Sequence, residues 1–198
     1  MPDQIDVEKR ALRAEIRERR QLLSEAQRAQ AAETLTTHLD DLLARTGARS
    51  ISCYLSTTTE PDTRPFVNAA VERGIRVLLP VTRADGLLDW AVASPDGDEI
   101  EGLLGIPEPD GELLGPMEVD TVDLLLIPAA AVGPDGTRLG WGRGYFDKTI
   151  GSMERCPPVY AIVYDSEYIE DVPRDVHDQP VDGIVTPTRI VDFTPAAR

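Results

Sequence analysis

The sequence predicts an α/β fold: a three-layer sandwich around a mainly parallel central sheet. Short apolar runs of strand length alternate with segments of helical pattern along the chain, and such alternation is typical of a parallel sheet covered by helices. Val122–Pro128 is an almost unbroken apolar run, as expected for a strand buried on both faces. With 198 residues and 41% hydrophobic composition, the chain suits a single domain spanning residues 1–198.

Helix signals mark four segments. Ser24 and Gln27 form a capping-box pattern, while Thr63, Pro65 and Gly74 bracket a helix of roughly ten residues. The expected helices are Val7–Leu22, Ser24 to about Gly47, Thr63–Gly74 and Tyr145–Ser152. The expected strands are Ile51–Leu55, Val77–Val81, Trp90–Ala93, Val122–Pro128, Val159–Tyr164, Gly183–Val185 and Ile190–Phe193. Residues 87–116 are rich in Gly, Pro and acids, so we expect a long loop there with one short extra strand.

Composition excludes several classes of partner. A formal net charge of −15 argues against nucleic acid, because binding to a phosphate backbone needs clustered Lys and Arg. Apolar runs fall short of membrane-spanning length and the amino terminus is charged, so we expect a cytoplasmic protein with no membrane partner. Cys53 and Cys156 lack metal-site spacing and are interpreted as reduced structural residues. We expect a monomer that binds small molecules.

The most informative segment is the loop after the predicted central strand. Gly140, Gly142 and Gly144 allow backbone amides to approach an anion, and Arg138 and Arg143 add positive charge. The loop begins at the carboxyl end of a strand, where open α/β sheets bind ligands. Its spacing matches neither the Walker loop nor the dinucleotide-binding turn. The pattern indicates a phosphate site, with a glycine-rich surface loop as the alternative.

Five short motifs together resemble one enzyme family. Arg138–Lys148 (RLGWGRGYFDK) resembles the RLGxGxGYYDR signature of the 5-formyltetrahydrofolate cyclo-ligases, also called 5,10-methenyltetrahydrofolate synthetases. Lys9–Arg13 (KRALR), Glu60–Thr63 (EPDT), Gly105–Pro109 (GIPEP) and His177–Asp182 (HDQPVD) resemble further motifs of that family in the family's order. The resemblance therefore covers nearly the whole chain.

The chain departs from the family pattern at four positions. Gly133 stands where the family usually has the aspartate of a PGxAFD sequence, which leaves open any role of that carboxylate in orienting the loop. Phe146 replaces the second tyrosine, Arg143 stands where lysine or glycine is common, and Lys148 replaces the usual arginine.

The resemblance implies an ATP- and Mg²⁺-dependent cyclisation of 5-formyltetrahydrofolate to 5,10-methenyltetrahydrofolate, through a phosphorylated formyl oxygen, with release of ADP and phosphate. The implied ATP contacts are Lys9, Arg13, Arg138, Gly140, Gly142, Arg143, Gly144 and Tyr145. The implied catalytic residues are Arg138, Arg143 and Tyr145, the implied folate contacts are Glu60 and Tyr145, and the implied metal ligands are Asp147 and Asp182.

Each of these residues also has a structural interpretation. Lys9 and Arg13 lie four residues apart and form a cationic ridge with Arg17, which is ordinarily a solvated helix face. Arg10, Arg19 and Arg20 are assigned to that solvated face.

The acidic candidates have similar alternatives. Glu60 is alternatively a turn residue, and Asp147 a helix cap. Asp178 is alternatively the turn residue that positions Asp182. His177 precedes a turn that contains proline and is interpreted as structural rather than as a general base.

Two other functions fit the same residues. A sugar-phosphate isomerase on a similar fold would use the anion loop without ATP, with Asp147 or Asp182 as the base. The second alternative is a non-catalytic nucleotide- or folate-binding relative of the cyclo-ligases.

Overall fold

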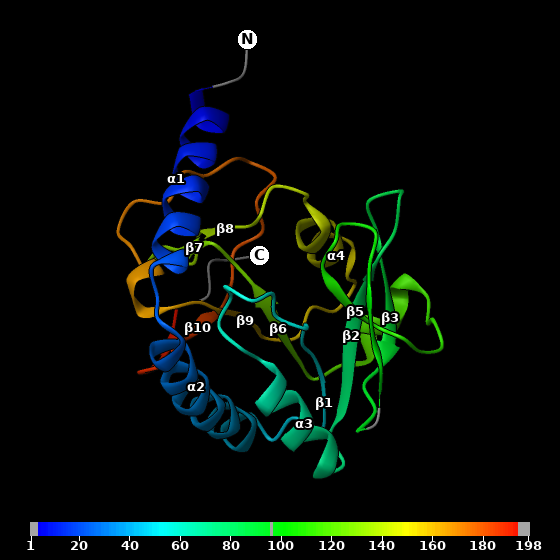
Figure 1. The fold of residues 1–198 in the computed structure, drawn as a ribbon. Coiled ribbons are helices and arrows are strands. Elements are labelled where there is room, and N and C mark those ends of the chain that lie inside the picture. The colour runs from blue at the N-terminus through cyan, green and yellow to red at the C-terminus, as the bar shows by residue number, and fades with distance from the viewer. Residues whose placement is uncertain (1–3, 96, 194–198) are drawn as a thin grey trace.

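The structure is a computed structural model that describes residues 4–95 and 97–193 (Figure 1). Its helices are α1 (Gln4–Gln21), α2 (Glu25–Thr46), α3 (Arg64–Glu72) and α4 (Tyr145–Ser152), with 3₁₀ turns η1 (Pro116–Thr121) and η2 (Asp165–Glu167). Its strands are β1 (Ser50–Ser52), β2 (Arg76–Thr82), β3 (Leu88–Val92), β4 (Glu99–Glu101), β5 (Pro107–Pro109), β6 (Leu124–Pro128), β7 (Ala131–Val132), β8 (Arg138–Leu139), β9 (Val159–Ile162), β10 (Gly183–Val185) and β11 (Ile190–Asp192).

Within the described residues, seven strands form the central sheet, in the order β11-β10-β9-β6-β1-β2-β3. The five inner strands are parallel, and the edge strands β3 and β11 are antiparallel to their neighbours. The mainly parallel sheet predicted from the sequence is therefore confirmed. The strands that read as apolar runs occupy its centre, where both faces are covered.

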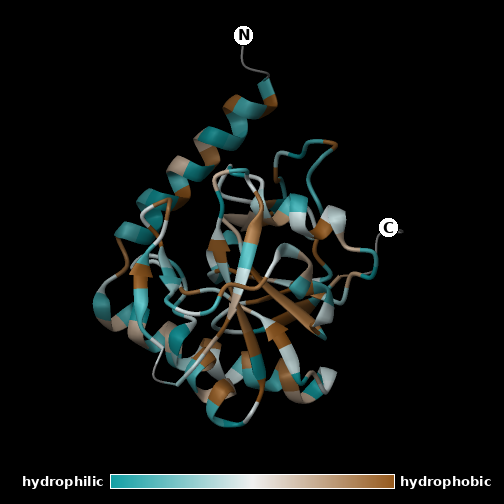
Figure 2. Cartoon of the chain, turned by 90° about the vertical axis from the view of Figure 1, so that its right-hand side faces the viewer, coloured by the Kyte–Doolittle hydropathy of each residue, from teal (hydrophilic) through white to brown (hydrophobic). Residues whose placement is uncertain are grey.

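The alternation of side chains along β6 divides the core into two layers. Leu124 and Leu126 join the cluster under α2 and α3, whereas Leu125 and Ile127 join the opposite cluster, with residues of η1 and α4. The strands are the most apolar part of the ribbon (Figure 2). Helical elements thus cover both faces, and the sandwich prediction is correct.

The helix boundaries follow the predicted caps, with one correction. The backbone N–H of Gln27 donates to Ser24 Oγ at 3.2 Å and the N–H of Ser24 donates to Gln27 Oε1 at 2.9 Å, so the capping box opens α2. Thr63 precedes α3 as expected, but its side chain does not cap the helix. Its hydroxyl donates instead to the Tyr54 carbonyl at 2.5 Å. Burial of Thr63 against the end of β1 is the reason.

Two small hairpins lie outside the sequence prediction. The antiparallel pair β4–β5 lies in the segment assigned to a loop, and the antiparallel pair β7–β8 follows the central strand. Strands of two or three residues are too short to show a period in the sequence. The first hairpin is held by Glu108 of β5, a buried residue whose carboxylate accepts from the Thr82 N–H at 2.9 Å. The β7–β8 hairpin leads directly into the glycine loop.

The first helix packs on the second of these hairpins. Ile16 is buried in a cluster with Ala130, Ala131 and Leu139, and Leu12 packs against the same cluster. Only the amino-terminal end of α1 extends past the body of the molecule (Figures 1 and 2). Among the described residues, no helix combines the length and apolar character needed to cross a membrane.

Candidate active site

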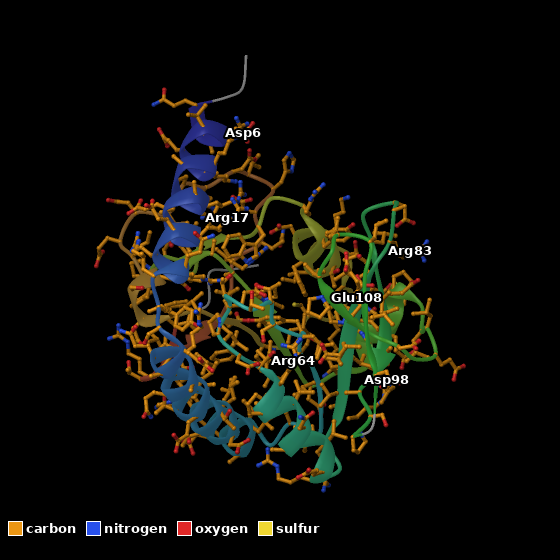
Figure 3. All side chains as sticks on the ribbon, viewed as in Figure 1. Asp6, Arg17, Arg64, Arg83, Asp98 and Glu108 are labelled. Carbon is orange, nitrogen blue, oxygen red and sulfur yellow. The ribbon has the colours of Figure 1, made fainter. Side chains whose placement is uncertain are left out.

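A cavity of about 400 Å³ opens beside the glycine loop. Its walls come from α1, the segment after β1, the end of β2, β5, and the loop that enters α4. Figure 3 labels Arg17 on α1, which lines the cavity, and Glu108 on β5, next to the lining residue Pro107. Four arginines and two acids line the cavity: Arg17, Arg20, Arg138, Arg143, Glu60 and Asp147. A chain with a net charge of −15 therefore concentrates positive charge at this one place, as an anionic ligand requires.

The cavity brings together most of the residues singled out in the sequence. Those that line it are Glu60, Arg138, Gly140, Arg143, Gly144, Tyr145 and Asp147. Lys9, Arg13, Gly142 and Asp182 lie outside the lining. Residues distant in sequence, from the EPDT turn to the start of α4, thus meet at the carboxyl end of the sheet.

The glycine loop adopts a conformation that only glycine tolerates well. Gly142 and Gly144 have φ angles of 91° and 70°, in the left-handed region where a side chain is strained. Gly144 immediately precedes α4, so the amides of the first helical turn have no acceptor within the helix. Because Gly144, Tyr145 and Asp147 line the cavity, that turn presents a helix amino terminus suited to an anion.

Arg13 supports this loop from α1. Its Nε donates to the Gly140 carbonyl at 2.7 Å, and a Cβ at Gly142 would lie 3.3 Å from the guanidinium carbon. Burial lowers the pKa of Arg13 from its ordinary value, and the neighbouring charge of Arg17 lowers it further. The arginines around the loop therefore repel one another, and a bound anion would relieve that repulsion.

The two loop arginines have different environments. Arg138 is buried and pairs with Asp147 Oδ1 at 2.5 Å. The same oxygen accepts from the Gln179 N–H at 3.1 Å. Arg143 is exposed and has no hydrogen-bond or ion-pair partner among the residues that the structure describes. Arg138 thus supports the loop from within while it also lines the cavity, and Arg143 is available to a ligand.

Lys9 connects α1 to the HDQPVD segment. Its Nζ lies 2.5 Å from Asp178 Oδ2, with 9% of its side chain exposed. Asp178 Oδ2 also accepts from the Asp175 N–H at 2.7 Å, which agrees with the turn interpretation of Asp178. Contact between Lys9 and ATP stays a prediction.

The two predicted metal ligands occupy different positions. Asp147 lines the cavity, whereas Asp182 precedes β10 and its Oδ2 accepts from the Val159 N–H at 2.8 Å. No cluster of three or more His, Cys or acidic residues suited to a metal occurs in the described part of the chain. Mg²⁺ is commonly held by one or two carboxylates, water and phosphate oxygens, and Asp147 fits that donor set. The metal site shared by Asp147 and Asp182 stays a prediction.

The predicted folate contacts both reach the cavity wall. Glu60 lines it, and its Oε2 accepts from the Thr57 N–H at 2.8 Å, closing the turn of residues 57–60 that leads into the EPDT segment. The Tyr145 hydroxyl donates to the Arg83 carbonyl at 2.9 Å, so its ring is held in the wall by the β2–β3 turn. Glu60 therefore combines the turn role with a position suited to a ligand.

Arg20 is a correction to the sequence analysis, which placed it on the solvated face. Its side chain is 2% exposed, with Nε 2.6 Å from Glu167 Oε1 and Nη2 donating to the Ala129 carbonyl at 3.0 Å. Burial alone would lower the pKa of Arg20, but its hydrogen bond to Glu167 raises it above the ordinary value. Arg20 follows Ile16 by four residues and so shares its buried face, a signal that the sequence did contain.

Trp141 joins the glycine loop to the same helix. The guanidinium carbons of Arg17 and Arg20 lie 5.2 Å and 4.9 Å from its ring centre, within the range of cation–π contacts. Arg20 also lies 5.7 Å from the Tyr164 ring centre. The loop therefore contacts α1 at two residues: Trp141 through Arg17 and Arg20, and Gly140 through Arg13.

The comparisons with known proteins agree with the family resemblance found in the sequence. The family model described as the 5-formyltetrahydrofolate cyclo-ligase family matches residues 5–187. The chain belongs to the 5-formyltetrahydrofolate cyclo-ligase family. It is accordingly an enzyme of the ligase class.

Two curated relatives and one solved structure illustrate the match. The 5-formyltetrahydrofolate cyclo-ligase of Mycolicibacterium smegmatis is 32% identical, covering 91% of this chain and 94% of that protein. The cyclo-ligase of Escherichia coli is 27% identical, covering 90% of this chain and all of that protein. The 5,10-methenyltetrahydrofolate synthetase structure from Aquifex aeolicus has a TM-score of 0.78 at 26% identity, covering 96% of this chain and 95% of the other.

We predict that Glu167→Gln destabilises this cyclo-ligase by about 3 to 5 kcal/mol, because it leaves the buried Arg20 charge without its counter-ion. The measurement is the free energy of unfolding from urea denaturation. Glu15→Gln is the matched control: it breaks the Arg19 pair on the same helix, where the Glu15 side chain is 61% exposed, and costs less than about 1 kcal/mol. Equal losses in the two variants would contradict the buried ion pair.

Proposed function

We propose that this protein converts 5-formyltetrahydrofolate to 5,10-methenyltetrahydrofolate with hydrolysis of ATP to ADP and phosphate. The observation that carries the proposal is the single cavity that joins Glu60 to the glycine loop with Arg143. It offers a carboxylate for the aminopyrimidine edge of a pterin and a cationic loop for a triphosphate. Family membership supplies the reaction.

The nucleotide side is the glycine loop. Arg143 is exposed on this loop and free to bind phosphate oxygens. The amides of the first turn of α4 form the positive end of the helix dipole, next to the same space. Arg138 holds Asp147 in place, and Arg13 holds Gly140. These contacts preorganise the loop before a triphosphate arrives, which lowers the cost of ordering it on binding.

The folate side lies toward β1 and β5. Glu60 is in hydrogen-bonding reach of the cavity, and Leu55, Leu104, Ile106 and Pro107 give it apolar walls. A planar pterin suits such a combination, because its ring buries apolar surface while its polar edge needs a few fixed partners.

The chemical problem is the poor electrophilicity of the amide-like formyl group. In the proposed reaction, the formyl oxygen attacks the γ-phosphorus of ATP and ADP leaves. N10 of the folate then attacks the formyl carbon and loses its proton to solvent, and the C–O bond breaks to release phosphate. Arg138, Arg143 and Tyr145 are the proposed catalytic residues, acting by neutralising charge and by positioning, which dominate catalysis of phosphoryl transfer. No protein nucleophile is needed.

Mg²⁺ is the proposed metal, and it would neutralise charge on the phosphate oxygens. Asp147 is placed to hold it at the cavity wall. Asp182 is proposed as the second carboxylate, directly or through one water. We also propose that the protein acts as a cytoplasmic monomer on these two small molecules, without nucleic acid or membrane partners.

A spectrophotometric assay for the methenyl product, with and without ATP and Mg²⁺, tests the proposal directly. Product that depends on both supports it. Product-free binding of folate or ATP would instead identify a non-catalytic relative, and turnover of a sugar phosphate without ATP would identify an isomerase.

We predict that Arg143→Ala raises the KM for ATP roughly ten- to a hundredfold, as expected for loss of a charge-assisted contact, and changes folate binding much less. Arg138→Ala should also raise the KM for ATP, and it should lower the stability of the fold as well, because it leaves Asp147 without its ion-pair partner Arg138. Arg10→Ala is the control, since Arg10 is exposed on α1 and the change in net charge is identical. If Arg143→Ala leaves the KM for ATP unchanged, the glycine loop is not part of the nucleotide site.

We predict that Glu60→Gln weakens folate binding roughly tenfold or more and leaves ATP binding unchanged, because the amide has one acceptor where the carboxylate has two. Isothermal titration calorimetry with each ligand separately makes the measurement. Glu101→Gln, on an exposed position of β4, is the control for the loss of one negative charge. Parent-like folate affinity in Glu60→Gln would leave Glu60 as a turn residue only.

We predict that Asp147→Asn and Asp182→Asn each raise the Mg²⁺ concentration needed for half-maximal activity. The double variant should lose much less than the sum of the single losses, because residues that serve one ion are coupled. Asp171→Asn, on an exposed residue of the same carboxyl-terminal region, should leave the requirement unchanged. Strictly additive losses would show that the two carboxylates do not serve one ion.

A further inference from the structure

Four buried polar atoms without a partner in the described residues belong to side chains that line the cavity. They are the Tyr54 hydroxyl, Arg20 Nη1, Trp141 Nε1 and Arg138 Nε, of which the first two lie in side chains near Glu60 rather than in the glycine loop. Tyr54 is 5% exposed and Arg20 is 2% exposed. A buried polar group without a partner is costly, so its presence in a cavity wall indicates a group that pairs with a ligand.

The Tyr54 hydroxyl is a fixed donor. The Tyr54 backbone carbonyl accepts from the Thr63 hydroxyl, and the Tyr54 ring lies in the core cluster under α2 and α3. Burial raises the pKa of Tyr54 well above its ordinary value, and the charge of Glu60 raises it further. Tyr54 is therefore protonated at neutral pH, and its O–H is a donor.

Arg20 supplies a second donor at the same end of the cavity. Its Nε and Nη2 are taken by Glu167 and the Ala129 carbonyl, which leaves Nη1 for another acceptor. Glu60, Tyr54 and Arg20 all line the cavity. Tyr164 connects two of them, since its ring centre lies 5.7 Å from the Arg20 guanidinium carbon and its hydroxyl donates to the Glu60 carbonyl at 3.3 Å. Next to a carboxylate that accepts, the cavity thus holds two groups that donate.

This arrangement matches one edge of a 2-amino-4-oxopyrimidine. The 2-amino group and N3–H of such a ring are adjacent donors suited to Glu60, and the neighbouring 4-oxo oxygen is an acceptor with two lone pairs. We propose that Tyr54 and Arg20 bind the 4-oxo oxygen of the pterin and so determine specificity for 4-oxo over 4-amino folates. The inference rests on the proposed function and names the part of the substrate that the site recognises.

Titration calorimetry without ATP tests the inference, using 5-formyltetrahydrofolate and its 4-amino-4-deoxy counterpart. Tyr54→Phe should weaken binding of the 4-oxo compound roughly three- to tenfold and leave binding of the 4-amino compound unchanged. The Kd of the 4-amino compound divided by the Kd of the 4-oxo compound should therefore fall. Tyr160→Phe is the matched control, because the Tyr160 hydroxyl pairs with Asp192 and Arg45 outside the cavity. Its Kd ratio should equal that of the parent.

Thermal unfolding without ligand adds a second measurement. Tyr54→Phe removes a buried hydroxyl that has no partner in the described residues, so its Tm should equal or exceed that of the parent. Tyr160→Phe loses a hydrogen bond to Asp192 at 2.5 Å and should have a lower Tm. A lower Tm in Tyr54→Phe would show that its hydroxyl has a partner within the protein and would overturn the inference.

The same experiments separate this inference from the proposed function. A parent protein that forms no methenyl product overturns both. A parent protein that forms the product, together with an unchanged Kd ratio in Tyr54→Phe, overturns the assignment of Tyr54 and Arg20 alone.

Discussion

The buried ion pair between Arg20 and Glu167 is the interaction on which the site depends. It joins α1 to η2, and through the Ala129 carbonyl it joins both to the end of the central strand β6. Trp141 of the glycine loop packs on the same guanidinium. Such a pair contributes little net stability compared with apolar packing, but breaking it leaves an unpaired buried charge. Its main effect is therefore to fix the position of α1 over the loop.

That position gives an acidic protein a basic cavity. The global charge of −15 repels ATP and folate alike, and the arginines of α1 and of the glycine loop reverse the sign locally. Arg13 and Arg138 act mainly within the protein, on Gly140 and Asp147, whereas Arg143 is exposed to a ligand. Arginines paired within the protein thus differ from one that is exposed, and residue type alone does not reveal the difference.

Much of the molecule was predictable because it depends on local pattern. The mainly parallel sheet followed from apolar runs, and α2 and α4 followed from the capping box and the glycine loop. Errors arose where long-range contacts prevail over local preference. Thr63 bonds to the Tyr54 carbonyl instead of capping α3, and the β4–β5 hairpin is held by the buried carboxylate of Glu108 on the distant Thr82.

By itself, the sequence determined the fold class, the family and seven of the residues that line the cavity, because periodicity, glycine spacing and short motifs are local properties of a chain. Only the tertiary structure decided which charges are buried. Arg20 and Arg143 look alike in the sequence, yet one is enclosed by Glu167 and Trp141 while the other is exposed. Burial depends on which distant segments pack together, and no spacing along one segment specifies that.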